Sequence, residues 1–195
     1  MAESTVEPIT ATESSIEQIL QNIDSASDKQ GPNETKLADA WGYRKTVMAK
    51  YDLPELGSDP VEYIRRMEEF LKRKGIDVRG IHEFDRFFQE NHEAAAVANE
   101  HGIIIGAANG SDIERLKLRG RSIAHEAVHA LQDLLYPRMP LEEMEREAYY
   151  YEYLTPSVIL NNKDRPDFLK GVLGVLEDKV QMSTIVDERL REEER

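Results

Sequence analysis

The stretch Arg119-Gly-Arg-Ser-Ile-Ala-His125-Glu126-Ala-Val-His129-Ala-Leu-Gln-Asp133 contains the pattern His-Glu-x-x-His and decides how the rest of the chain is interpreted. On an α-helix, residues four apart lie one turn apart on the same face, so both imidazoles can reach one ion. Glu126, beside the first histidine, is placed to take a proton from a metal-bound water and to deliver it later to a leaving amine.

The residues around this motif favour a helix with two different faces. At about 100° per residue, His129 lies about 40° from His125, and Gln132 and Asp133 fall on the same polar side. The apolar residues fall on the opposite side (Ile123, Ala127, Ala130, Leu131 and Leu134). The pattern therefore predicts a helix whose back lies in a hydrophobic core and whose histidines face a cleft.

A catalytic zinc site needs a third protein ligand and one open position. The chain has no cysteine, so this ligand must be His, Asp or Glu. The remaining histidines precede the motif and show no recognisable ligand spacing (His82, His92 and His101). Downstream, residues 141–154 are predicted to form an acidic helix after a proline-marked turn. Glu142, Glu145 and Glu152 lie near one stripe of that helix, so each is a candidate ligand.

The combination His125-Glu-x-x-His129 and Glu145-x-x-Ala148 resembles the gluzincin metallopeptidases. Together with Ser122-Ile-Ala before the first histidine, it is most similar to the compact ImmA/IrrE-type proteins and the minimal gluzincins. The resemblance covers residues 76–160. It implies an α+β fold, a zincin-like domain in which a small, mostly antiparallel sheet packs against the active-site helix.

The resemblance also implies a function. His125, His129 and Glu145 would hold a Zn2+ ion, and Glu126 would be the general base of a metallopeptidase that hydrolyses peptide bonds through a zinc-activated water. The substrate would be a peptide or a protein. A tyrosine or arginine that the sequence does not identify would stabilise the oxyanion.

The chain departs from the family pattern directly after Ala148. The family usually places Asp or Asn there, where it hydrogen-bonds a zinc-binding histidine, whereas this chain has Tyr149. Asp133, Tyr149 and Glu152 are therefore the candidates for this supporting role. The departure also favours an alternative: a zincin-derived interaction or regulatory protein that keeps the fold, and the metal in some cases, without catalysis. The intact Glu126 argues against this alternative. A protein that had lost catalysis would commonly have lost Glu126 first, because the fold does not need that residue.

Hydrophobic periodicity organises the rest of the chain. Two helices are predicted, one at residues 37–51 and one from Asp59-Pro60 to Gly75. Together they would form a helical cap that consists of residues 36–75. Three short apolar runs are predicted to be strands, at residues 76–81, 94–98 and 103–105. The second and third of these are predicted to pair as a β-hairpin.

Together with the resemblance, these elements imply a single zincin-like domain over residues 36–186. It would consist of the cap, the catalytic core at 76–160 and a C-terminal helix at 164–186. The polar residues 1–35 are predicted to be a disordered acidic arm with at most a transient helix. The charged residues 187–195 are predicted to be a solvated tail.

Composition limits the partners. The 195 residues include 38 acidic residues against 25 lysines and arginines, and the formal net charge is −13. This balance argues against nucleic acid and anionic membranes as partners, since both bind basic surfaces. The N-terminal residues lack the apolar core of a secretory signal, and the longest apolar run, residues 102–108, is too short to span a bilayer. We therefore expect a cytoplasmic protein.

Overall fold

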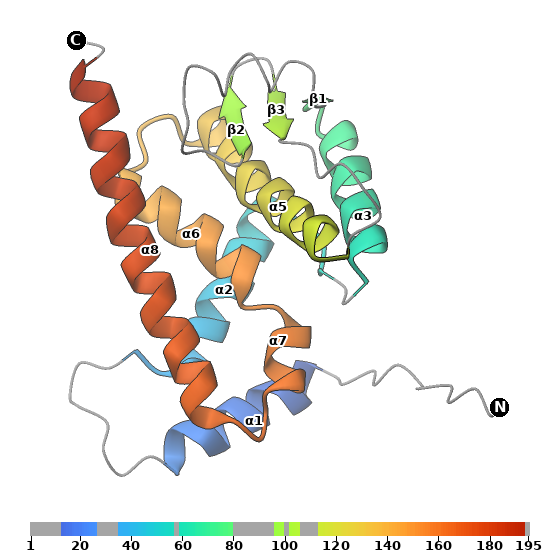
Figure 1. The fold of residues 1–195 in the computed structure, drawn as a ribbon, viewed down its shortest axis with the longest axis vertical. Coiled ribbons are helices and arrows are strands. Elements are labelled where there is room, and N and C mark those ends of the chain that lie inside the picture. Colours follow the sequence, from blue (N-terminus) through green and yellow to red (C-terminus); the bar gives the residue numbers. More distant parts are fainter. Residues whose placement is uncertain are drawn as a thin grey trace, which may run out of the picture.

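Helices dominate the computed structural model of the chain (Figure 1). The structure describes residues 13–26, 35–56, 59–79, 96–99, 102–105 and 113–193. Within these ranges the helices are α1 (Glu13–Ser25), α2 (Leu37–Tyr51), α3 (Pro60–Arg73), α5 (Ile113–Leu135), α6 (Leu141–Tyr153), α7 (Pro156–Asn161) and α8 (Pro166–Glu193). The helices predicted at 37–51 and 141–154 correspond closely to α2 and α6. Gly75, with a φ of 76°, follows the end of α3, as the sequence pattern predicts.

The predicted α+β class with a mostly antiparallel sheet is wrong. The strands are β1 (Val78–Arg79), β2 (Ala96–Asn99) and β3 (Gly102–Ile105), with β3 in the centre. Strands β2 and β3, which correspond to the predicted hairpin, pair antiparallel, but β1 pairs with β3 in parallel. These segments are too short to form a layer of their own. Where the burial of side chains is described, the buried apolar residues form two clusters on amphipathic helices and the connections between them.

Helix α6 lies between two hydrophobic clusters and contributes to both. One cluster joins α6 to α2, α3 and α5, and the side chains of Ala148 and Tyr151 belong to it. The other joins α6 to α1, α2, α7 and α8, and it contains Tyr150. Figure 1 shows α6 between α5 and α8, and it contacts both helices. Packing on two sides fixes the position of α6 relative to α5.

The N-terminal segment differs from its prediction. Residues 13–25 of the predicted disordered arm form α1, whose apolar side chains are buried in the second cluster (Ile16, Leu20 and Ile23). The side chain of Asp24 accepts hydrogen bonds from the backbone N–H groups of Leu37 and Ala38, at 3.1 and 2.9 Å, and thereby caps α2. A helix of this length is marginal alone, so tertiary packing stabilises α1, and the local sequence does not reveal that packing.

Replacing Leu20 by alanine tests whether α1 is part of the core. The Leu20 side chain is 0% exposed, so we expect the free energy of unfolding to fall by about 2–5 kcal/mol, measured by chemical denaturation. The matched control is Gln21→Ala, because Gln21 is exposed on the same helix. Equal stability of the two variants would mean that α1 is not docked in solution.

The C-terminal helix is longer than predicted. Helix α8 has 28 residues and continues through Glu193, so it includes most of the segment predicted to be a solvated tail. Leu169, Leu173, Leu176 and Val180 form its buried side. Among the described helices, none is long and apolar enough to cross a membrane.

Candidate metal centre

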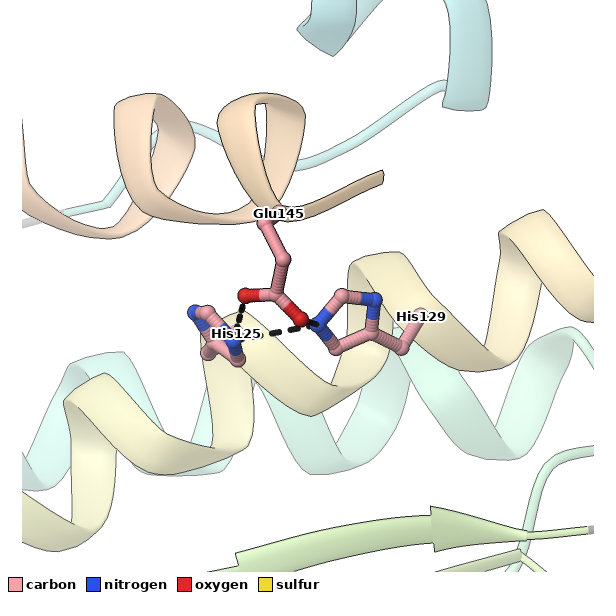
Figure 2. Close-up of side chains that lie close together, drawn as sticks. All are labelled: His125, His129 and Glu145. Atoms are coloured by element: carbon pink, nitrogen blue, oxygen red, sulfur yellow. Dashed lines mark hydrogen bonds and ion pairs between the residues drawn. The ribbon is translucent and has the colours of Figure 1, made fainter. Parts of the chain in front are cut away.

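Helix α5 brings the two motif histidines together. Opposite the histidines, the side chains of Ile123, Ala127 and Leu131 are buried, although Leu134, which the periodicity places on the same side, is exposed. These contacts hold α5 in the orientation that its periodicity predicts. The Nε2 atoms of His125 and His129 lie 3.0 Å apart and point toward α6 (Figure 2).

Helix α6 supplies a carboxylate that faces both histidines. Glu145 is only 5% exposed. Its Oε2 lies 3.5 Å from Nε2 of His125, and its Oε1 lies 3.4 Å from Nε2 of His129 (Figure 2). Ala148, one turn further along α6, is fully buried against α5. Its small side chain lets the two helices approach closely enough for Glu145 to reach the histidines.

The other two candidate ligands lie differently. Glu142 is exposed and forms an ion pair with Arg146, with a nitrogen–oxygen distance of 2.9 Å. Glu152 contacts the outer ring nitrogen of His125, with 3.2 Å between Nδ1 and Oε2. Among these three carboxylates, only Glu145 therefore faces the Nε2 atoms of both histidines. Glu152 occupies the supporting position for which the sequence offered three candidates.

The three side chains fit a small divalent cation. One ligand atom from each of His125, His129 and Glu145 can be chosen so that all lie within 4.8 Å of one another. The separations of 3.4 and 3.5 Å between Glu145 and the histidines match a tetrahedral zinc site, whose ligand atoms are roughly 3.3–3.5 Å apart when each lies about 2.0–2.1 Å from the ion. The two histidine nitrogens, at 3.0 Å, are slightly closer than that. Oε2 of Glu145 is buried without a hydrogen-bond donor, and such an atom is costly unless a cation or donor meets it.

The carboxylates and the histidines of the cluster shift each other's pKa values. Burial acts to lower the pKa of His125, but the nearby carboxylates of Glu145 and Glu152 outweigh it and raise that pKa to about 10. Burial acts to raise the pKa of Glu145, yet the two histidines hold it below its ordinary value. The carboxylates therefore stabilise positive charge on the imidazole of His125, and the histidines stabilise negative charge on Glu145.

Tyr149 and Asp133 do not hydrogen-bond the histidines. The ring of Tyr149 packs against the ring of His125, with 4.4 Å between centroids, and its hydroxyl lies 2.8 Å from Oγ of Ser183 on α8. Burial is the main reason why the pKa of Tyr149 rises to about 12. Asp133 is exposed. The hydroxyls of Tyr150 and Tyr151 bond to Glu177 and to the carbonyl of Pro54, so these tyrosines do not present free donors for an oxyanion.

Glu126 follows His125 on α5 and is partly exposed. Its negative charge contributes to the raised pKa of both His125 and Tyr149, which places its carboxylate in the electrostatic environment of the site. The three other histidines of the chain, at positions 82, 92 and 101, lie outside the described residues.

The sequence analysis did not assign a role to two buried residues beside the site. Gln132 hydrogen-bonds Nδ1 of His129 at 2.9 Å, and Glu147 hydrogen-bonds Gln132. The sequence did carry a signal for Gln132, because its helical position lies on the histidine side of α5. The sequence carried no such signal for Glu147, because this residue lies off the stripe of α6 that contains Glu145.

The comparisons with known proteins add nothing to this geometry. No family model, no curated protein and no solved structure matches the chain.

Substitution of the three glutamates tests which one is the ligand. Glu145→Gln should weaken zinc binding most, by more than about 100-fold, because it removes one of only three protein ligands. Glu152→Gln should weaken it about 10–100-fold through His125. The exposed Glu142→Gln is the matched control and should stay close to the wild type. Competition with a chromophoric chelator measures all three, and an order other than this one would refute the assignment.

Proposed function

We propose that the protein is a zinc-dependent metallopeptidase that hydrolyses peptide bonds in peptide or protein substrates. The observation that carries the proposal is the position of Glu145. From a second helix, its carboxylate faces the Nε2 atoms of both histidines of a His-Glu-x-x-His helix, and one of its oxygens is buried without a donor.

The roles of the chain's own residues follow from this arrangement. His125, His129 and Glu145 hold the ion, which when bound supplies Lewis-acid activation of water and of a substrate carbonyl. Glu126 accepts the proton of the attacking water and delivers it to the leaving amine. Glu152 orients His125 through its outer nitrogen. The packing of Tyr149 on the His125 ring, with its hydroxyl bonded to Ser183, further restricts how that ring can turn.

Cleavage of a quenched-fluorescent peptide library tests the proposal directly. The zinc-loaded full chain should cleave part of the library, a chelator should stop cleavage, and added zinc should restore it. Mass spectrometry of the products should show hydrolysed peptide bonds. Tight zinc binding without cleavage of the library or of denatured protein substrates would refute the peptidase and would favour the non-catalytic, zincin-derived alternative.

A further inference from the structure

Gln132 is fully buried one turn beyond His129, at 0% exposure, and its side-chain amide makes three hydrogen bonds. Its Oε1 lies 2.9 Å from Nδ1 of His129. Its Nε2 donates to the backbone carbonyl of Met144 at 3.1 Å and to Oε2 of Glu147 at 2.9 Å. The amide thus connects a histidine of α5 to two groups of α6.

The chemistry of these partners determines which way the amide points. The Met144 carbonyl can only accept hydrogen bonds. Glu147, which is 3% exposed, also accepts, because it already receives Lys50 Nζ and the Tyr51 hydroxyl, each at 2.6 Å. A reversed amide would direct its oxygen at both acceptors, so the NH2 group must face them. The oxygen of Gln132 therefore faces His129.

This orientation decides where the hydrogen of the His129 ring is. Since Gln132 presents an acceptor, the Nδ1 atom of His129 must carry the hydrogen. Its Nε2 lone pair then points inward, toward His125 and Glu145, which is the form that a metal ligand requires.

We propose that Gln132 is a positioning residue that holds His129 in the tautomer with its hydrogen on Nδ1, and that the buried group of Glu147, Lys50 and Tyr51 in turn holds the Gln132 amide. The benefit for metal binding rests on the proposed zinc site, whereas the tautomer itself is a property of the metal-free protein. The two histidines are thus supported differently: His125 by a carboxylate and His129 by a neutral amide. An amide adds no further negative charge to a region that already holds Glu145, Glu147 and Glu152.

The first test measures the tautomer. Nitrogen-15 NMR of the imidazoles in the metal-free full chain should show the His129 hydrogen on Nδ1. In Gln132→Leu, which has nearly the same shape but no acceptor, this preference should disappear, and zinc affinity should fall about 10–100-fold. Asp133→Asn is the matched control, because Asp133 lies next to Gln132 on α5 but is exposed and does not hydrogen-bond a histidine. It should keep the tautomer and bind zinc within a few-fold of the wild type.

The second test exchanges the two side chains. Gln132→Glu alone brings two carboxylates together where the wild type has a 2.9 Å hydrogen bond, so it should weaken zinc binding. Adding Glu147→Gln supplies a donor again, while position 132 still presents an acceptor to His129. The double variant should recover part of the zinc affinity that Gln132→Glu alone loses, although the carboxylate at position 132 still faces the Met144 carbonyl. A role in filling space would produce no recovery.

The outcomes separate this inference from the proposed function. A wild-type protein with the Nδ1 tautomer but no zinc binding would refute the zinc site and support the inference. A zinc-binding wild type whose His129 hydrogen lies on Nε2 in the metal-free state, or a Gln132→Leu variant with unchanged tautomer and affinity, would overturn the inference alone.

Discussion

Purified protein is expected to bind about one zinc ion per chain tightly, and His125→Ala or His129→Ala is expected to abolish that binding. Two remaining ligands hold zinc poorly, because a stable protein site needs at least three protein ligands. Equilibrium dialysis followed by elemental analysis measures the bound metal. The loss should be the largest effect of any substitution near the site, because each histidine directs an Nε2 atom into the cluster.

Loss of zinc must be separated from loss of the fold. Each alanine also removes partners of buried groups, namely Glu152 for His125 and Gln132 for His129. The circular dichroism and thermal midpoint of the metal-free variants should therefore be compared with those of the metal-free wild type. Asp133→Asn is the matched control, since Asp133 is exposed on the same helix. Full zinc occupancy in the double histidine variant would refute the site.

Glu126→Gln is expected to leave zinc binding and fold intact while hydrolysis falls by orders of magnitude. The amide has nearly the same shape as the carboxylate but cannot accept the proton of the attacking water. Initial rates on the best peptide from the library, measured with zinc-loaded wild type and variant, give the comparison. Zinc content determined on the same samples shows whether the metal site is unchanged.

A matched control for this prediction is Glu143→Gln. Glu143 is an exposed acid on α6 and is not one of the three residues that could hold the metal. The Glu143→Gln substitution changes the net charge by the same amount as Glu126→Gln. Any effect of charge alone on substrate binding should therefore appear in both variants. Hydrolysis by Glu126→Gln within a few-fold of the wild type would remove the general base from the mechanism, and the peptidase with it.

Features of the fold that depend on short stretches of chain could be predicted. The helical period places His125 and His129 on one face and Ile123, Ala127 and Leu131 on the other, and α5 has this arrangement. Leu134, which was also expected to face the core, is exposed near the end of the helix. Prolines 137 and 140 separate α5 from α6 as expected. Such features follow from local backbone geometry and from the period of apolar residues, which neighbouring residues alone determine.

Features that depend on partners distant in the sequence could not be predicted. The stripe of Ile16, Leu20 and Ile23 was too weak to indicate a stable helix, because its stability comes from burial against α2 and α8. The fold class was mistaken because short apolar runs predicted a sheet as a main layer, whereas the described core is formed by long helices. The sequence cannot show how much apolar surface each element finally buries.

The same division applies to the site. The sequence by itself determined that two histidines and Glu126 share one turn of helix, and that several carboxylates follow on the next. Only the tertiary structure decided that Glu145 faces both histidines, that Glu152 and not Tyr149 or Asp133 bonds His125, and that Gln132 bonds His129. The physical reason is that these contacts depend on the height and rotation of α6 against α5. Packing on both sides of α6 sets those quantities, and the spacing of residues along the chain does not.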